Sequence, residues 1–182
     1  MGSNKNNKKM YIILTHTGTI LSRIIKYYTK AEFSHISIAL DEELDEMYSF
    51  GRLNPYNPFV GGFVREGINV GTFKRFSNTI AAVYSFDLTS KQYRKLKQLI
   101  KKVKRKKYLY KFNIIGLFAV GFNIKVRRDN YFYCAEFVKY LIEEAKLELK
   151  LPELVKPIDF KDLQGLDLEY RGMLKNYRVI SD

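Results

Sequence analysis

Cys134 is the single cysteine of the chain, and it stands where a polar segment gives way to a sequence with helical periodicity. A thiol at the start of a helix lies near the positive end of the helix dipole and near free backbone N–H groups, which favours the thiolate. A predicted strand begins near His35, and its imidazole would complete a thiolate–imidazolium pair. The alternative is that Cys134 is a small buried hydrophobic residue, because free cysteine is often buried.

The residues around these two positions resemble the motifs of a known family. Segments 34–40 (Ser-His-Ile-Ser-Ile-Ala-Leu) and 133–138 (Tyr-Cys-Ala-Glu-Phe-Val) resemble the His and Cys motifs of the permuted papain-like cysteine hydrolases. This is the YiiX-like branch of the NlpC superfamily, which is related to the lecithin retinol acyltransferase group. In that branch the His strand precedes the Cys helix, as it does here. Segment 156–160 (Lys-Pro-Ile-Asp-Phe) is similar to the family's Pro-x-Asp segment, so the resemblance covers roughly residues 10–165.

The resemblance implies an α+β fold with a circularly permuted papain-like topology, in which a small antiparallel sheet packs against the Cys helix. It also implies a thiol hydrolase or acyltransferase in which Cys134 attacks an amide or ester carbon and His35 acts as general base. Bacterial cell-wall peptides, peptidoglycan fragments or lipid-like substrates are the implied substrate classes. We expect no cofactor.

A third residue normally orients the imidazole by accepting a hydrogen bond from its second ring nitrogen. In this superfamily the next strand supplies a His, Asn, Gln or acid, but here that strand has the sequence Met-Tyr-Ser-Phe-Gly over residues 47–51. Because side chains alternate along a strand, Met47 and Ser49 share a face, and of the two only Ser49 offers a polar atom. We therefore predict that Ser49 is the third member or that the site works as a dyad.

Further polar residues are candidates for binding the substrate. Arg52 and Arg65 flank an aromatic segment and could hold a substrate carboxylate through bidentate hydrogen bonds, or they could be surface charges. Glu136 lies in the first turn of the Cys helix, where it could bind substrate or simply complement the helix dipole. His16 is the other candidate base and ranks below His35. One cysteine and two histidines do not form a typical zinc site, so we expect no metal.

The net charge of +13 is confined to two segments. Residues 91–107 hold ten Lys or Arg residues and no acid, and Lys5, Lys8 and Lys9 account for the remaining excess. The basic run predicts either a solvated helix face or a patch for an anionic surface. A nucleic-acid-binding protein stays open as an alternative but is disfavoured, because the rest of the chain carries no net charge. A second alternative is an inert lipid- or peptide-binding module of the same fold.

The patterns of the remaining chain predict the elements that would position these residues. Strands are expected over 11–16, 33–40, 47–50 and 79–88, with an acidic turn at 41–46 and a long, partly irregular loop over 51–71. Helical spacing is expected over 20–28, from a capping box at Thr89 and Gln92, and from Cys134 onward. Residues 112–122 form an apolar stretch that is too short to span a bilayer.

The organisation predicted is a flexible basic tail over residues 1–9 and a single domain over residues 10–182. No signal peptide or transmembrane segment is visible, and a lone cysteine rules out an internal disulfide. The expected location is therefore the cytoplasm.

Overall fold

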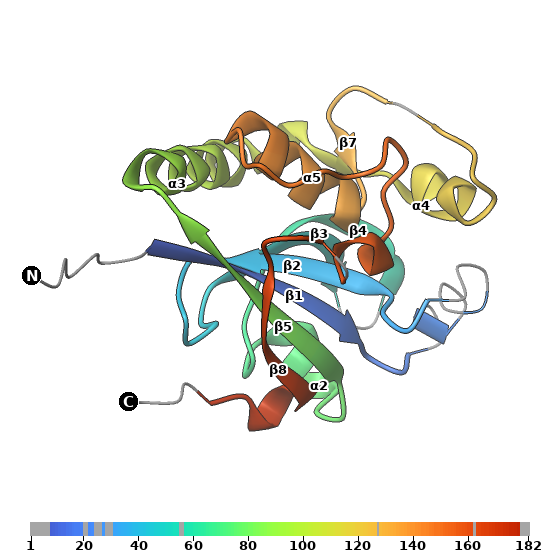
Figure 1. Cartoon of the computed structure of the whole chain (residues 1–182). Coiled ribbons are helices and arrows are strands. Elements are labelled where there is room, and N and C mark those ends of the chain that lie inside the picture. Colours follow the sequence, from blue (N-terminus) through green and yellow to red (C-terminus); the bar gives the residue numbers. More distant parts are fainter. Residues whose placement is uncertain are drawn as a thin grey trace, which may run out of the picture.

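Apolar side chains on both faces of the first strand place it inside the sheet. The computed structural model describes residues 8–19, 22–23, 27, 31–54, 57–126, 128–161 and 163–178. Within these ranges six strands form an antiparallel sheet in the order β4-β3-β2-β1-β5-β8 (Figure 1). The strands are β1 (Lys8–His16), β2 (His35–Ala39), β3 (Met47–Asn54), β4 (Asn57–Glu66), β5 (Ile80–Leu88) and β8 (Asp167–Met173).

Helices cover both faces of this sheet. On one face lie α3 (Ser90–Arg105), α4 (Ile114–Gly121) and α5 (Cys134–Glu144), and on the other lie α2 (Gly71–Arg75) and η3 (Leu174–Asn176) (Figure 1). The short strands β6 (Lys111–Phe112) and β7 (Tyr131–Phe132) pair in parallel, and η1 (Lys107–Leu109) and η2 (Pro157–Phe160) are single turns. The chain is therefore a mixed α+β structure with an antiparallel sheet, and this fold class is the one predicted.

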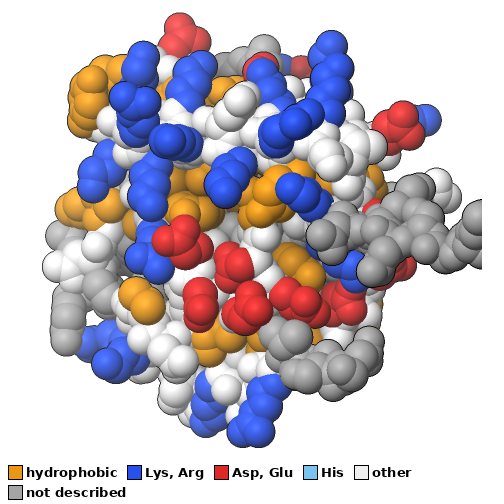
Figure 2. Space-filling model, turned by 90° about the vertical axis from the view of Figure 1, so that its left-hand side faces the viewer, with side chains coloured by type: hydrophobic (Ala, Val, Ile, Leu, Met, Phe, Trp, Pro, Cys, Tyr) orange, Lys and Arg blue, Asp and Glu red, His pale blue; other side chains and the backbone are white. Residues whose placement is uncertain are grey.

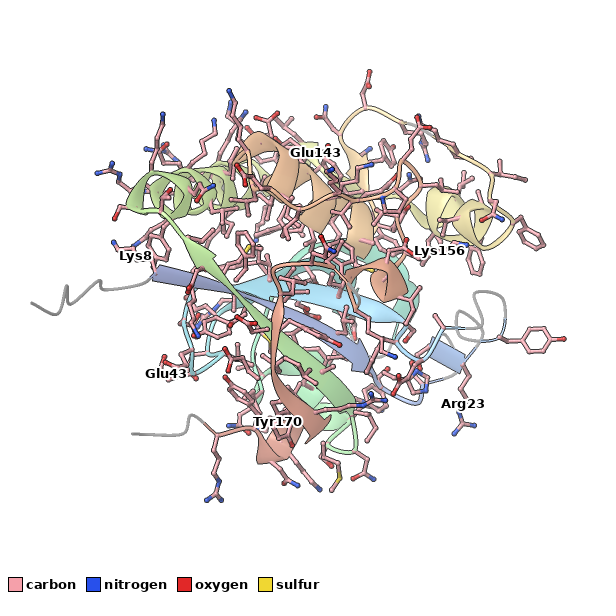
Figure 3. All side chains as sticks on the ribbon, viewed as in Figure 1. Lys8, Arg23, Glu43, Glu143, Lys156 and Tyr170 are labelled. Atoms are coloured by element: carbon pink, nitrogen blue, oxygen red, sulfur yellow. The ribbon has the colours of Figure 1, made fainter. Side chains whose placement is uncertain are left out.

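The basic helix α3 begins at the predicted capping box. The Gln92 N–H donates to Thr89 Oγ1 at 3.2 Å, and the Thr89 N–H donates to Gln92 Oε1 at 3.0 Å. Leu96, Leu99, Ile100 and Val103 form its buried stripe, while its lysine side chains project outward (Figures 2 and 3). No helix of the described residues is long and apolar enough to cross a membrane.

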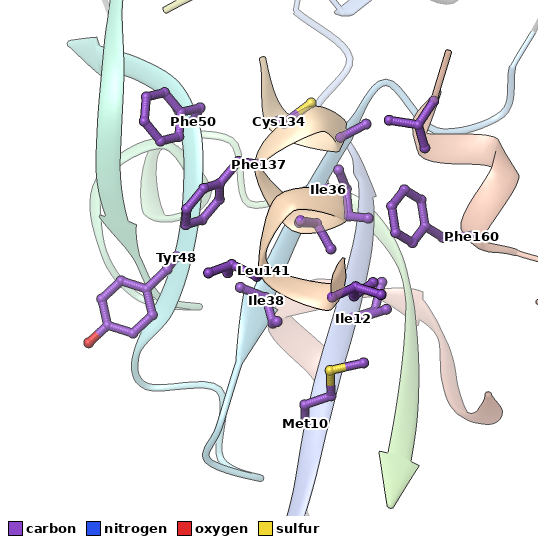
Figure 4. Packing of buried hydrophobic residues seen from close by; sticks show 14 of the residues in the cluster. Met10, Ile12, Ile36, Ile38, Tyr48, Phe50, Cys134, Phe137, Leu141 and Phe160 are labelled. Carbon is purple, nitrogen blue, oxygen red and sulfur yellow. The ribbon is translucent and has the colours of Figure 1, made fainter. Parts of the chain in front are cut away.

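Helix α5, which carries Cys134, packs on β2 and β3. Phe137 and Leu141 lie over Ile36 and Ile38 in a core from which solvent is almost excluded, with Cys134 at the start of the helix (Figure 4). Burying an aliphatic or aromatic side chain of this size contributes about 1.5–3 kcal/mol, so this packing fixes where the helix begins.

The largest error of the sequence-based prediction is the loop expected over residues 51–71. Most of this segment is strand: β3 continues to Asn54, and β4 pairs with it in antiparallel register from Asn54↔Asn57 to Met47↔Glu66. The glycines that suggested a loop allow close packing instead, since a Cβ at Gly61 would lie 2.7 Å from Cγ of Phe112.

Other differences from the predictions are smaller. Strand β1 begins at Lys8, so Lys8 and Lys9 belong to the sheet and not to the predicted tail. Edge strand β8 was not predicted, because its residues are mostly exposed and show no apolar alternation. Most of the helix expected over 20–28 and residues 1–7 of the tail lie outside the described residues. The apolar stretch over residues 112–122 contains α4.

Candidate active site

Cys134 is the first residue of α5 and is only 4% exposed. The preceding Tyr133 has an extended backbone, and its buried hydroxyl donates to the Val155 carbonyl at 2.8 Å. The Tyr133 N–H is accepted by Glu136 Oε2 at 3.1 Å. These bonds fix the approach of the chain to the helix, and with it the position of the thiol at the positive end of the dipole.

His35 is the first residue of β2, and its side chain interacts with Cys134, with Glu66 and with Ser37, whose Oγ lies 3.4 Å from Nε2. Cys134 lies close enough to the imidazole to raise the pKa of His35. The imidazole Nε2 lies 3.2 Å from both Oε1 and Oε2 of Glu66. The structure therefore brings together Cys134 and His35, which are far apart in the sequence, and adds a carboxylate at Nε2 of the ring.

Glu66 is held in place by two serine hydroxyls. Ser37 Oγ donates to its Oε2 at 2.6 Å and Ser49 Oγ donates to the same oxygen at 2.8 Å. Both serines are fully buried, and the Glu66 side chain is 11% exposed. A buried carboxylate that accepts this many hydrogen bonds has a fixed orientation, so the Glu66 carboxylate can in turn fix the imidazole.

The electrostatics of the pair favour the charged form of each partner. Burial alone would lower the pKa of His35, but the negative charge of Glu66 and the hydrogen bonds with Cys134 and Glu66 raise this pKa above its ordinary value. Burial would raise the pKa of Glu66, but the charge of His35 and the hydrogen bonds from His35, Ser37 and Ser49 hold it below its ordinary value.

A small cavity of about 60 Å³ borders His35 and Glu66. Hydroxyl-bearing side chains line one part of it, and aromatic and aliphatic side chains line another. The hydroxyl-bearing residues are Thr17, Thr19, Ser22, Ser34 and Thr72, and the apolar ones are Phe50, Phe73, Phe112 and Leu117. Gly51 also lines it, and a Cβ there would lie 3.2 Å from His35 Cε1. The imidazole thus occupies space that a larger residue at position 51 would take.

The other predicted site residues lie at different distances from this centre. Ser49 reaches it, but its hydroxyl bonds to Glu66. Arg65 Nε lies 3.2 Å from Glu46 Oε1, and its side chain is 54% exposed. Arg65 pairs across the sheet with Tyr48 of the face opposite to Glu66, so the structure does not bring it to His35. The side chain of Arg52 lies outside the described residues.

Glu136 and His16 have partners of their own. Glu136 Oε2 accepts the Tyr133 N–H and the Asn113 amide, at 3.1 and 3.3 Å, so this carboxylate ties the start of α5 to the loop before α4. His16 Nδ1 lies 3.4 Å from Ser34 Oγ at the end of β1. These contacts of Glu136 and His16 are therefore with residues other than Cys134, His35 and Glu66.

Sequence reasoning missed Glu66 because it fell within the segment expected to be a loop. The available signal was the alternation of residues 63–66 (Phe-Val-Arg-Glu), which matches that of residues 47–50 when the two segments are paired as a hairpin. In that register Met47 opposes Glu66, so Glu66 and Ser49 share a face.

Within the described residues, no group of three or more His, Cys, Asp or Glu side chains is placed to hold a metal ion. Comparisons of the chain with protein-family models, with curated proteins and with solved structures found no match.

Proposed function

We propose that the chain is a thiol hydrolase or acyltransferase with a circularly permuted papain-like topology. The observation that carries this proposal is the arrangement of Cys134, His35 and Glu66, in which a thiol at a helix start lies beside an imidazole that is oriented by a buried carboxylate. The order of the His strand and the Cys helix agrees with the resemblance of the two motifs.

The reaction would proceed through a thioester. The Cys134 thiolate attacks the carbonyl carbon of an amide or ester, and the imidazolium of His35 gives its proton to the leaving amine or alcohol. His35 then takes a proton from water, or from an acceptor nucleophile, as that group attacks the thioester carbonyl. The acyl group leaves on the new nucleophile, and the thiolate and imidazolium are restored.

The start of α5 would stabilise the oxyanion intermediates. The Cys134 N–H at the start of α5 is available for the oxyanion that forms on attack, and the helix dipole adds positive potential at that point. Glu66 keeps the ring in one orientation and stabilises its charge. A carboxylate in the position of the orienting residue supports a catalytic role over an inert lipid- or peptide-binding module of the same fold.

The proposal is tested by the rate at which iodoacetamide alkylates Cys134 as pH is varied. The chain has one cysteine, so the label reports a single thiol. We expect wild type to react quickly well below the pH at which a free thiol ionises, about 8.5, and His35→Ala to lose this reactivity. His16→Ala is the matched control and should react like wild type, because His16 contacts Ser34.

A second measurement tests turnover. With p-nitrophenyl acetate, wild type should release a burst of one nitrophenol per thiol and gain the mass of one acetyl group on Cys134, whereas Cys134→Ser should do neither. A wild-type alkylation rate that rises only near pH 8.5 and does not change in His35→Ala would contradict the proposal.

A further inference from the structure

A groove with oppositely charged sides lies between α3 and the turn that joins β2 to β3. Its volume is about 690 Å³, within the range of ligand and contact sites. Figure 2 shows the three bands that form it: Lys and Arg on α3, a strip of apolar side chains, and Asp and Glu of the turn. The apolar floor consists of Leu40, Tyr48, Tyr93 and Ile100.

The basic side is built by the periodicity of α3. Lys97, Lys101, Lys104 and Arg105 recur at helical spacing beside the buried stripe, so the helix directs all four toward one side. The buried stripe anchors the helix in the core. The cations are therefore fixed relative to the groove at their Cα positions, while their long side chains can extend across it.

The acidic side is a turn held by its own contacts. The Asp41 carboxylate accepts the Asp45 N–H at 2.6 Å and the Glu46 N–H at 3.4 Å. Leu44 is fully buried and ties the turn to the sheet. The groove-lining acids are Asp41, Glu43, Asp45 and Glu46. Figure 3 shows Glu43 on the same side of the molecule as Lys8.

The charged side chains on the two sides of the groove form few contacts with each other. Among the ion pairs of the described residues, none joins a groove cation of α3 to an acid of the turn. Glu46 instead pairs with Arg65 and accepts the Tyr48 hydroxyl, and Lys104 Nζ lies 5.7 Å from the centroid of the Tyr48 ring. The groove therefore offers to a partner four cations and the three acids Asp41, Glu43 and Asp45, which none of these ion pairs engages.

We infer that this groove is a self-association surface, through which two copies of the chain pair about a two-fold axis. A surface with one basic side and one acidic side is complementary to itself after a rotation of 180°, as a two-fold interface requires. The rotation places α3 of one copy against the acidic turn of the other and covers both apolar floors. A polyanion fits less well, because the acidic turn would repel it.

The pairing would leave the candidate active site open. His35 begins β2 and the acidic turn follows the other end of this strand, so the groove and the Cys134 site lie at opposite ends of β2. The inference is thus independent of the proposed function, and dimer formation can be measured without a substrate.

Sedimentation velocity of the full chain tests the inference by charge reversal. We expect a dimer at low salt that weakens at high salt, because the screening length falls from about 10 Å at 0.1 M to about 3 Å at 1 M. Lys101→Glu and Glu43→Lys should each raise the dissociation constant at least about tenfold, since symmetry makes each change act twice. An equimolar mixture of these two variants should form heterodimers, because both contacts then join opposite charges.

Two matched controls separate the groove from overall charge. Lys102 and Glu148 are exposed and lie outside the groove lining, so Lys102→Glu and Glu148→Lys should dimerise like wild type. A wild-type protein that stays monomeric at all salt concentrations would overturn the inference. The same holds if the monomer binds a mixed-charge peptide in the groove. Failure of the mixed variants to form heterodimers, or an equal loss of dimer in the controls, would also overturn it.

Discussion

Glu66 determines the charge that His35 carries next to the thiol. Burial alone would lower the pKa of His35, so the raised pKa depends on the Glu66 carboxylate together with the hydrogen bonds of the ring. A neutral amide at position 66 can keep a hydrogen bond to Nε2 but cannot supply the charge. We therefore expect Glu66, which contacts the imidazole, to influence the reactivity of the thiol.

Glu66→Gln tests this dependence. We expect the pKa of His35 to fall from its raised value to the ordinary 6.5 or below, and alkylation of Cys134 at neutral pH to slow about tenfold or more. Proton NMR of the imidazole Cε1–H across pH measures the first effect, and His16→Ala assigns the two histidines. An unchanged His35 titration in Glu66→Gln would show that the carboxylate does not set the charge of the ring.

Gly51 should be required for the position of the imidazole. In Gly51→Ala the added Cβ would meet His35 Cε1 at 3.2 Å, which is closer than ordinary contact, so the ring must move away from Cys134 or Glu66. We expect alkylation to slow several-fold while the fold persists. Gly62→Ala is the matched control, since Gly62 pairs with Gly51 across the hairpin and the nearest atoms to its Cβ would belong to the Leu53 side chain, from 3.4 Å.

Equal loss of reactivity in the two glycine variants would indicate a general effect on the hairpin and contradict this role for Gly51. Circular dichroism and the thermal midpoint of each variant establish whether the hairpin has survived.

At the scale of elements, Asn113 links two helix starts. Its Oδ1 accepts the Gly116 N–H at 3.0 Å and so caps α4, while its Nδ2 donates to Glu136 of α5 and to the Val126 carbonyl. Because Asn113 is fully buried, losing its side chain leaves several of these partners unsatisfied. The start of α5, and therefore the position of Cys134, depends on this bridge.

Asn113→Ala should lower the free energy of unfolding by about 2 kcal/mol and also slow alkylation of Cys134. Thr89→Ala removes an ordinary N-cap of α3 at the surface and should cost about 1 kcal/mol without changing thiol reactivity. Urea titration measures the first quantity and iodoacetamide the second. If Asn113→Ala leaves reactivity unchanged, the bridge serves stability alone.

The contrast between β1 and β4 shows which parts of the fold could be predicted from the sequence. Strand β1 is apolar on both faces, so composition alone predicts it. In β4, Pro58, Gly61 and Gly62 suggest a loop, and the strand is explained only by its pairing with β3 and by the close packing of Gly61 against Phe112. Tertiary contacts of this kind are not visible in a local pattern.

The same limit applies to the candidate site. Cys134 and His35 were found because each starts an element with a strong local pattern and a recognisable motif. The sequence separation of Glu66 and His35 does not indicate that they are in contact. The register of the β3–β4 hairpin is what brings Glu66 to the imidazole. Ser49 was selected from the correct strand face, but its hydroxyl contacts the carboxylate that the prediction lacked.

For the molecule as a whole, two groups of charged residues lie at opposite ends of β2. The buried His35–Glu66 pair lies at its start, and the exposed cations and acids of the groove lie beyond its end. Exposed pairs contribute little to stability, whereas a buried and hydrogen-bonded pair whose pKa values are shifted couples stability to pH. The pH dependence of folding should therefore report mainly on the buried pair.

The sign of this dependence follows from the two shifts. The pKa of Glu66 is lowered on folding, so its contribution is complete above the unfolded value of about 4.3 and is lost as pH falls through the folded value. The pKa of His35 is raised, so its contribution is complete below about 6.5 and is lost as pH rises toward the folded value. Both contributions are complete only between these two unfolded values.

We therefore expect the contribution of this pair to the free energy of unfolding to be largest between about pH 4.3 and 6.5. Urea titration across pH measures it. Glu66→Gln removes the charge of one partner and should flatten the curve on both sides of that window. Glu148→Gln removes an exposed carboxylate and should leave its shape unchanged. A Glu66→Gln curve with the wild-type shape would mean that other groups govern the pH dependence, and that His35 and Glu66 are not charged together in the folded protein.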